Sequence, residues 1–251
     1  MPHNALQQKL LAGEPAVGVV SSIRSALAAG VLARAGLSHV LIDHQHGEWD
    51  DSSQREGLAA VHLHGVTPVV RVAHNSYTAI GRALDSGALA IIVPMVNTAE
   101  EARAAAFAMR YPPRGGRSSG DNLLTALGPD YTTSADGAVF LAVQIETAEG
   151  LANAEAIMAV EGVDGCWLGP ADLALSLGTV QGSAQHTEAV RRVLRACQAA
   201  GKVPGMFAGT PAIARRWIEE GYRFVTVSGD SRLLEDAARA VMQEVEGVYT
   251  S

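Results

Sequence analysis

The sequence has no cluster of basic residues and no long apolar run. Lysine and arginine together number 19 against 26 aspartates and glutamates, which gives a formal net charge of −7. Nucleic acid and anionic membrane surfaces are therefore poor candidate partners. The longest apolar run, from Ala88 to Val96, contains Pro94 and falls short of the ~18 residues of a membrane span.

Cysteine is also scarce. Cys166 and Cys197 are the only two, too few for a disulfide framework. The first ten residues, MPHNALQQKL, have neither the basic start nor the apolar core of a secretory signal. We therefore expect a cytoplasmic protein.

What the sequence does contain is an alternation of short apolar, β-branched runs with longer segments of helical spacing. The apolar runs are nearly continuous, as expected for parallel strands covered on both faces. At roughly 31 residues per unit, eight units predict a single (β/α)8 TIM-barrel domain over residues 1–251. The predicted strands are Ala16–Val20, His39–Asp43, Thr67–Val72, Ala90–Met95, Val139–Glu146, Gly165–Leu168, Val203–Phe207 and Phe224–Val227.

An open doubly wound sheet is the structural alternative, but it seldom needs eight complete units. Its dinucleotide-binding version would carry Gly-x-Gly-x-x-Gly after the first strand, and that motif is absent. One long connection, Tyr111–Asp136, is rich in Gly, Pro, Ser and Arg. A loop of this length in a compact barrel is more often functional than idle.

Barrel active sites lie where the strands end, and polar residues gather at these junctions. Glu146 follows an apolar run and Asp172 comes one strand later, so the two carboxylates could share one metal ion. Mg²⁺ and Mn²⁺ prefer such hard oxygen ligands. The structural alternatives are a salt bridge from Glu146 to an arginine and a helix N-cap at Asp172.

Two further strand ends carry candidate residues. Arg71 ends a valine-rich strand, so its guanidinium should face the barrel mouth and suit a carboxylate or a developing enolate. An ion pair with a rim acid is the alternative. His44 and His46 flank Gln45 after the second strand and could serve as a base, as metal ligands or only as polar loop residues.

The scarcity of lysine narrows the mechanism. The only lysines are Lys9, before the first predicted strand, and Lys202, directly before the seventh. Neither is expected at the catalytic end of the barrel, so a Schiff-base mechanism lacks its nucleophile. A Gly-x-Ser-x-Gly nucleophile elbow is also absent.

Taken together, these residues resemble the HpcH/HpaI family of metal-dependent, pyruvate-forming class II aldolases. The resemblance runs from end to end and rests on the segments HVLIDHQHG, PVVRV, MRYPPRGGR, QIETAEG and GCWLGPADL. It implies a lyase that reversibly cleaves a 4-hydroxy-2-oxo acid into pyruvate and an aldehyde. It further implies a divalent ion (Mg²⁺, Mn²⁺ or Co²⁺) as Lewis acid, and a homo-oligomer, because family relatives assemble as hexamers.

By this resemblance Glu146 and Asp172 hold the metal ion, and Arg71 binds the pyruvate oxygens. His46 matches the catalytic histidine, which moves the proton of the C4 hydroxyl, directly or through a metal-bound water.

The resemblance assigns further roles near these four residues. Asp85 corresponds to an aspartate associated with the catalytic histidine, and Asp43 to the acid of the second strand. The expected substrate contacts besides Arg71 are Gln45, Gly169 and Ala171.

The chain departs from the family pattern at three positions. Gln45 replaces a common glutamate, Val20 replaces a tryptophan in the first strand, and Thr125 falls about where the long connection carries an arginine. The departures leave the acceptor aldehyde open. We expect neutral or hydroxylated aldehydes to be preferred over succinic semialdehyde.

Two other functions compete with the aldolase. A citrate lyase-like or malyl-CoA lyase-like enzyme of the same barrel group would need a basic surface for coenzyme A, which the sequence does not show. A non-catalytic barrel that only binds a 2-oxo acid would not need Glu146, Asp172, Arg71 and His46 together.

Overall fold

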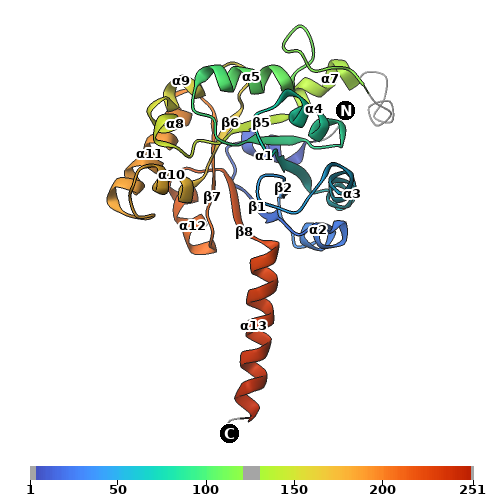
Figure 1. Cartoon of the computed structure of the whole chain (residues 1–251), viewed down its shortest axis with the longest axis vertical. Coiled ribbons are helices and arrows are strands. Elements are labelled where there is room, and N and C mark those ends of the chain that lie inside the picture. Colours follow the sequence, from blue (N-terminus) through green and yellow to red (C-terminus); the bar gives the residue numbers. More distant parts are fainter. Residues whose placement is uncertain (1–3, 121–130, 250–251) are drawn as a thin grey trace.

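The computed structural model describes residues 4–120 and 131–249 and contains a closed barrel of parallel strands in chain order, in which the last strand pairs with the first (Figure 1). This confirms the predicted TIM barrel. The strands are β1 (Ala16–Ser21), β2 (His39–Asp43), β3 (Thr67–Arg71), β4 (Ala90–Val93), β5 (Phe140–Val143), β6 (Gly165–Leu168), β7 (Val203–Phe207) and β8 (Phe224–Gly229).

Helices surround the barrel and return the chain to the start of each following strand. The described helices are α1 (Ala5–Leu11), α2 (Ala26–Ala33), α3 (Asp51–His62), α4 (Tyr77–Asp85), α5 (Ala99–Met109), α7 (Tyr131–Ala138), α8 (Ala148–Ala152), α9 (Ala154–Met158), α10 (Pro170–Ser176), α11 (Ala184–Ala199), α12 (Pro211–Glu220) and α13 (Asp230–Tyr249). Within residues 4–120 and 131–249, no helix combines the length and the apolar character that crossing a bilayer requires.

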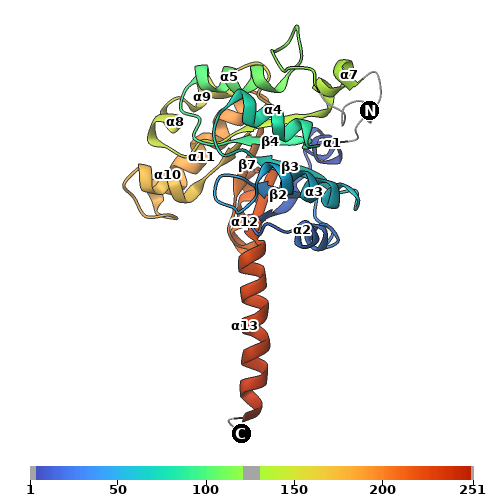
Figure 2. The same cartoon turned by 45° about the vertical axis from the view of Figure 1, so that its right-hand side comes forward.

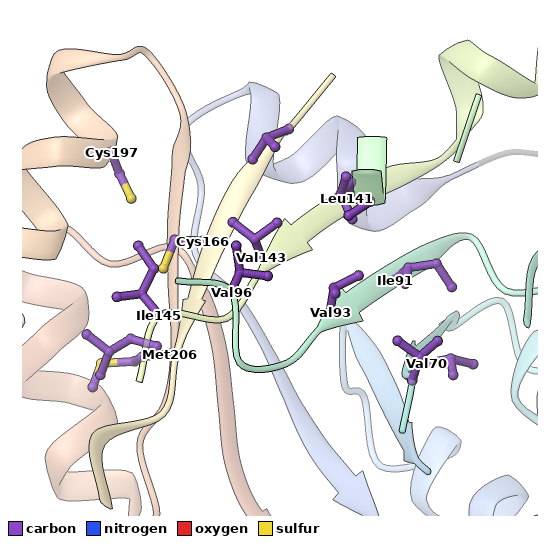
Figure 3. Close-up of a cluster of buried hydrophobic side chains, with 14 of the residues drawn as sticks. Val70, Ile91, Val93, Val96, Leu141, Val143, Ile145, Cys166, Cys197 and Met206 are labelled. Atoms are coloured by element: carbon purple, nitrogen blue, oxygen red, sulfur yellow. The ribbon is translucent and has the colours of Figure 1, made fainter. Parts of the chain in front are cut away.

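Both faces of the strands are buried, which explains their continuous apolar runs. Inward side chains such as Leu41, Val69 and Trp167 fill the barrel, and Leu6 and Leu10 of α1 pack into the same cluster. Outward side chains pack beneath the helices. Figure 3 shows part of this outer layer, including Val70, Ile91, Val93, Leu141, Val143, Cys166 and Met206.

Several sequence-based boundaries were wrong, and the fourth strand ends at Val93 rather than at Met95. The fifth strand ends at Val143 rather than at Glu146. Its neighbour β4 is followed by Pro94, which has no N–H, and by Met95, whose φ is 56°, so the regular ladder ends there. The connection Tyr111–Asp136 is not all loop either, because α7 begins at Tyr131.

The last helix, α13, stands away from the barrel instead of covering it (Figures 1 and 2). Its exposed apolar side chains include Leu234, 65% exposed, and Val241, 60% exposed. An open groove of about 810 Å³ runs along the outer side of β1 and β8. Its apolar lining includes Val17, Val19, Leu37, Ala214, Ile218 and Val227. The barrel therefore leaves one strand pair without the helical cover that its other strands have.

Candidate active site

A cavity of about 220 Å³ opens at the carboxyl ends of the strands. This is the end of the barrel where the sequence places the candidate residues. Four of them, Arg71, Gly169, Ala171 and Asp172, line this one cavity. The other lining residues are Val20, Gln144, Trp167, Pro170, Phe207, Ser228 and Gly229.

Arg71 is held by Asp43, which ends the neighbouring strand in the same register. Arg71 Nε lies 2.8 Å from Asp43 Oδ1, and Nη2 lies 2.5 Å from Oδ2, so the pair is bidentate. The guanidinium carbon lies 5.4 Å from the centroid of the Trp167 ring. Both charged groups are buried, and the fixed guanidinium borders the cavity. Arg71 thus does form the ion pair with an acidic residue that the sequence left open as an alternative. The same pair fixes the orientation of the guanidinium beside the cavity.

Glu146 lies in the loop after β5 and is buried without an arginine partner in the described chain. Its Oε1 accepts a hydrogen bond from the Met95 amide at 2.9 Å, and its Oε2 accepts one from Gln144 Nε2. Burial raises the pKa of Glu146 to about 7, and the nearby charge of Asp172 acts in the same direction. The charge of Arg71 acts in the opposite direction, but Glu146 forms no ion pair with any of the described residues.

The backbone of Gly169 allows this carboxylate to lie against β6. A Cβ atom at position 169 would lie 2.5 Å from Glu146 Oε2 and 2.9 Å from Gln144 Nε2, so any larger residue would displace these two side chains. Gln144 Oε1 is buried and has no hydrogen-bond partner among the described residues. Asp172 is not a helix N-cap, since Gly169 occupies that position of α10. Both structural alternatives for the acidic pair are thus excluded.

The donor set fits a divalent ion with oxygen ligands. Glu146 and Asp172 supply two carboxylates, and within residues 4–120 and 131–249 no group of three or more His, Cys, Asp or Glu forms a complete cage. Mg²⁺ and similar ions typically take one or two carboxylates and fill their other positions with water or substrate oxygens. Substrate oxygens could therefore reach an ion held here.

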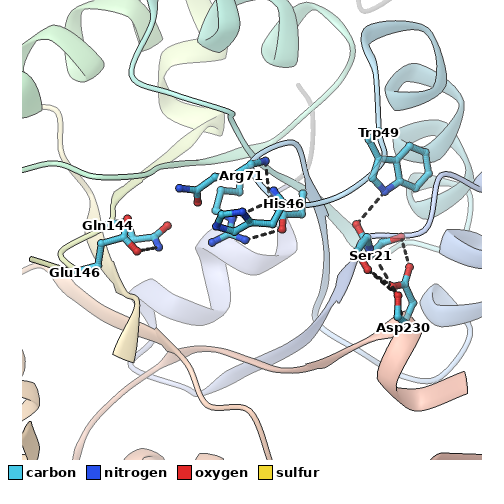
Figure 4. A network of polar contacts seen from close by, with 11 residues as sticks. Ser21, His46, Trp49, Arg71, Gln144, Glu146 and Asp230 are labelled. Atoms are coloured by element: carbon cyan, nitrogen blue, oxygen red, sulfur yellow. Dashed lines mark hydrogen bonds and ion pairs between the residues drawn. The ribbon is translucent and has the colours of Figure 1, made fainter. Parts of the chain in front are cut away.

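The two histidines after β2 face different surroundings. His46 is exposed in the loop, and its amide lies 3.4 Å from Asp43 Oδ1, which places it next to Arg71 (Figure 4). The Gln45 amide donates to the same oxygen at 3.0 Å. Neither His46 nor Gln45 lines the cavity itself. His44 instead lines a separate cavity between α3 and α4, which removes it from the candidate site.

Asp85 does not meet His46 within one chain. It is the last residue of α4, which runs back toward the start of β4, so it lies at the opposite end of the barrel from the cavity. There it accepts a hydrogen bond from Arg117 Nη2 at 2.8 Å. The expected association of Asp85 with His46 is therefore not found within this chain, where Asp85 pairs with Arg117 instead. Thr125 lies outside the described residues.

Sequence reasoning gave no role to several residues of this region. Trp167 and Phe207 line the cavity but read as ordinary apolar strand residues. Gln144 stands next to Glu146 at a strand end, which is the signal that could have identified it. Asp230 follows β8 directly, and its buried contacts could not be read from the sequence.

The family profile of HpcH/HpaI aldolase/citrate lyase matches residues 18–237, a span that contains all of these site residues. The chain belongs to this family. Membership makes it an aldolase-type carbon–carbon lyase.

Individual HpcH/HpaI relatives match over nearly the whole chain. The 4-hydroxy-2-oxo-heptane-1,7-dioate aldolase of Salmonella dublin is 38% identical over 245 residues, 95% of this chain and 93% of the relative. The structure of an HpcH/HpaI aldolase/citrate lyase family protein from Burkholderia cenocepacia J2315 is 37% identical, with a TM-score of 0.92, covering 97% of this chain and 100% of that one. The structure of the citrate synthase SbnG is 27% identical, with a TM-score of 0.90, covering 99% and 100%.

The raised pKa of Glu146 predicts that divalent metal ions bind more weakly in acid. Below pH 7 the carboxyl group must release a proton before it can bind a cation, so the apparent Kd should rise about tenfold per pH unit. Titration calorimetry with MnCl₂ at pH 6, 7 and 8 measures this slope. The control variant Glu146→Gln should bind weakly and lose the slope, and a wild-type Kd independent of pH would contradict the assignment.

Proposed function

We propose that this chain is a metal-dependent aldolase that reversibly cleaves a 4-hydroxy-2-oxo acid into pyruvate and an aldehyde. The observation that carries the proposal is that a fixed positive charge and two carboxylates lie close together at one end of the barrel. Arg71, fixed by Asp43, and Asp172 line the cavity, and the buried Glu146 lies beside it in contact with the lining residue Gln144.

Glu146 and Asp172 would hold the divalent ion, with Mg²⁺, Mn²⁺ and Co²⁺ as candidates. When bound, such an ion supplies a Lewis acid that polarises the 2-oxo group of the substrate. Gly169 and Ala171 leave room for the three-carbon pyruvate unit against the backbone at the start of α10.

Arg71 stabilises the negative charge that cleavage of the C3–C4 bond leaves on the pyruvate part. Asp43 occupies Nε and one N–H of Nη2, so the fork is oriented before the substrate arrives. A donor that needs no reorientation is most effective where charge develops during the reaction.

His46 is our candidate for the proton transfer at the C4 hydroxyl. It lies next to Arg71, which lines the cavity, and it is exposed, so its imidazole can exchange protons with solvent (Figure 4). In cleavage it takes the hydroxyl proton, and in condensation it returns it.

The acceptor side of the cavity favours an uncharged aldehyde. Val20, Trp167 and Phe207 line it, and Arg71 is the only cation among the described lining residues. The substrate named for the Salmonella relative is a dicarboxylic acid, whose second carboxylate would need another cation. We therefore propose a neutral or hydroxylated aldehyde as the partner of pyruvate.

A citrate-type or acyl-CoA substrate receives less support from the cavity. Such substrates carry additional negative charges, and Arg71 is already paired with Asp43. We also propose a cytoplasmic location, because the buried Cys166 and Cys197 are free thiols.

Substitution of the two central residues tests the reaction. Arg71→Ala should lower kcat/KM for aldol cleavage about 10²–10³-fold, as removal of an oxyanion donor does. His46→Ala should cost about 10²–10⁴-fold, the range of general acid–base catalysis. Pyruvate release in a coupled assay measures both, with His44→Ala as the matched control of near wild-type activity. Full activity in excess EDTA, or a crippling His44→Ala, would contradict the proposal.

We further propose that the protein is a homo-oligomer, with the hexamer of the family resemblance as the expected assembly. The groove over β1 and β8 fits α13 of a second copy. A chain cannot place its own α13 there, because no residue separates β8 from α13 to allow the helix to turn back. Arg232, Leu233 and Asp236 at the base of α13 line the same groove, so a symmetric exchange would bury both helices together.

Charged substitutions on the apolar face of α13 test this assembly. Leu234→Glu with Val241→Glu should convert the oligomer into monomers of 26.1 kDa, because the charges would have to enter an apolar groove. Light scattering after gel filtration gives the mass. Leu63→Glu is the control, since Leu63 is also exposed but directly follows α3, away from α13. A monomeric wild type, or an unchanged mass of the double variant, would contradict the exchange.

A further inference from the structure

Asp230 stands at the junction of β8 and α13 and is only 5% exposed. Its Oδ1 accepts hydrogen bonds from Ser22 N at 3.0 Å, Ser22 Oγ at 2.7 Å and Ser231 N at 2.8 Å. Its Oδ2 accepts from Ser21 Oγ at 3.0 Å and Ile23 N at 2.9 Å. One of these donors belongs to α13, and the others belong to the end of β1. Asp230 therefore does more than cap its own helix.

These bonds favour the ionised carboxylate. Burial opposes the charge, but the hydrogen bonds from Ser22, Ile23 and Ser231 outweigh it and lower the pKa of Asp230. An anion that accepts several N–H and O–H groups holds them in one geometry, which a neutral amide cannot do with the same donors.

The segment that Asp230 fixes supports the loop after β2. Ser21 O accepts the indole Nε1–H of Trp49 at 2.9 Å, and Ser22 O accepts the amide of Glu48 at 2.9 Å. A Cβ atom at Gly47 would lie 3.1 Å from Ser22 Cα, so the loop rests closely on this segment. Figure 4 shows the line from Asp230 through Ser21 to Trp49.

His46 belongs to this loop and lies between two attachments. On one side the loop amides reach Asp43, and on the other Glu48 and Trp49 reach the end of β1. The position of the exposed His46 imidazole therefore depends on the backbone that these attachments hold.

We propose that Asp230 is a positioning residue for His46. It fixes the end of β1, which in turn holds the loop that presents the imidazole at the edge of the cavity. This inference rests on the proposed function of His46.

The variant Asp230→Asn keeps the size of the side chain but removes its charge. We expect kcat for aldol cleavage to fall about ten- to a hundredfold, as when a catalytic group is misplaced. KM for the 2-oxo acid and the Kd for Mn²⁺ should change less than about twofold, because Arg71, Glu146 and Asp172 are untouched. Glu235→Gln, which alters an exposed carboxylate on the next turn of α13, is the matched control of unchanged activity.

A double-mutant cycle with His46→Ala separates positioning from general stability. If Asp230 acts through His46, Asp230→Asn should cost almost nothing once the imidazole is gone. Trp49→Phe removes one attachment of the loop but keeps an aromatic ring, and it should lower kcat in the same way. If Asp230→Asn does not fold, Trp49→Phe tests the positioning of His46 in its place. Light scattering confirms that each variant keeps its wild-type mass.

The inference would be overturned if Asp230→Asn lowered kcat equally in the presence and absence of His46. It would also be overturned if the substitution affected KM or metal binding instead of kcat. Unchanged activity of Asp230→Asn or of Trp49→Phe would overturn it as well. If His46→Ala alone is strongly impaired, each of these outcomes contradicts only the role of Asp230 and not the proposed function. A fully active His46→Ala would contradict the proposed function itself, and this inference with it.

Discussion

The site depends on the burial of Glu146, a carboxylate that forms no ion pair among the described residues. Asp172 lines the cavity and its charge acts on Glu146, whereas the nearby cation Arg71 is already engaged by Asp43. Burying an unpaired carboxylate is unfavourable, which is why the pKa of Glu146 rises to about 7. A divalent ion bound at Glu146 would remove this penalty. The burial that disfavours the free carboxylate is thus what supports the proposed metal site.

A second constraint comes from the way the barrel closes. Because β8 leads into α13 without a loop, Asp230 lies beside the end of β1 and reaches its serines. The same junction directs α13 away from its own barrel and leaves the groove over β1 and β8 open. The junction of β8 and α13 therefore affects two features of the protein. It directs α13 toward the proposed second copy, and through Asp230 it supports the loop that carries His46.

The sequence predicts the barrel well because its strands are buried on both faces, so each one appears as a continuous apolar run. It also places Arg71, Gly169, Ala171 and Asp172 at the cavity, since parallel strands all end at one rim, but His46 and Gln45 do not line it. It could not show that Asp43 binds Arg71, which depends on the register between β2 and β3. Helical spacing predicts α13 but not the direction in which it leaves the barrel. The resemblance to the family matched Asp85 with an aspartate near the histidine, but it did not reveal the ion pair of Asp85 with Arg117 at the other end of the barrel.

We propose that this site stabilises the enolate of pyruvate through Arg71 and a metal ion held by Glu146 and Asp172. Exchange of the pyruvate methyl protons in D₂O, followed by NMR with Mg²⁺ present, measures enolate formation without any aldehyde. We expect exchange in the wild type and in His46→Ala, a large loss in Arg71→Ala, and none in Glu146→Gln or in excess EDTA. Undiminished exchange in EDTA or in Glu146→Gln would contradict the account.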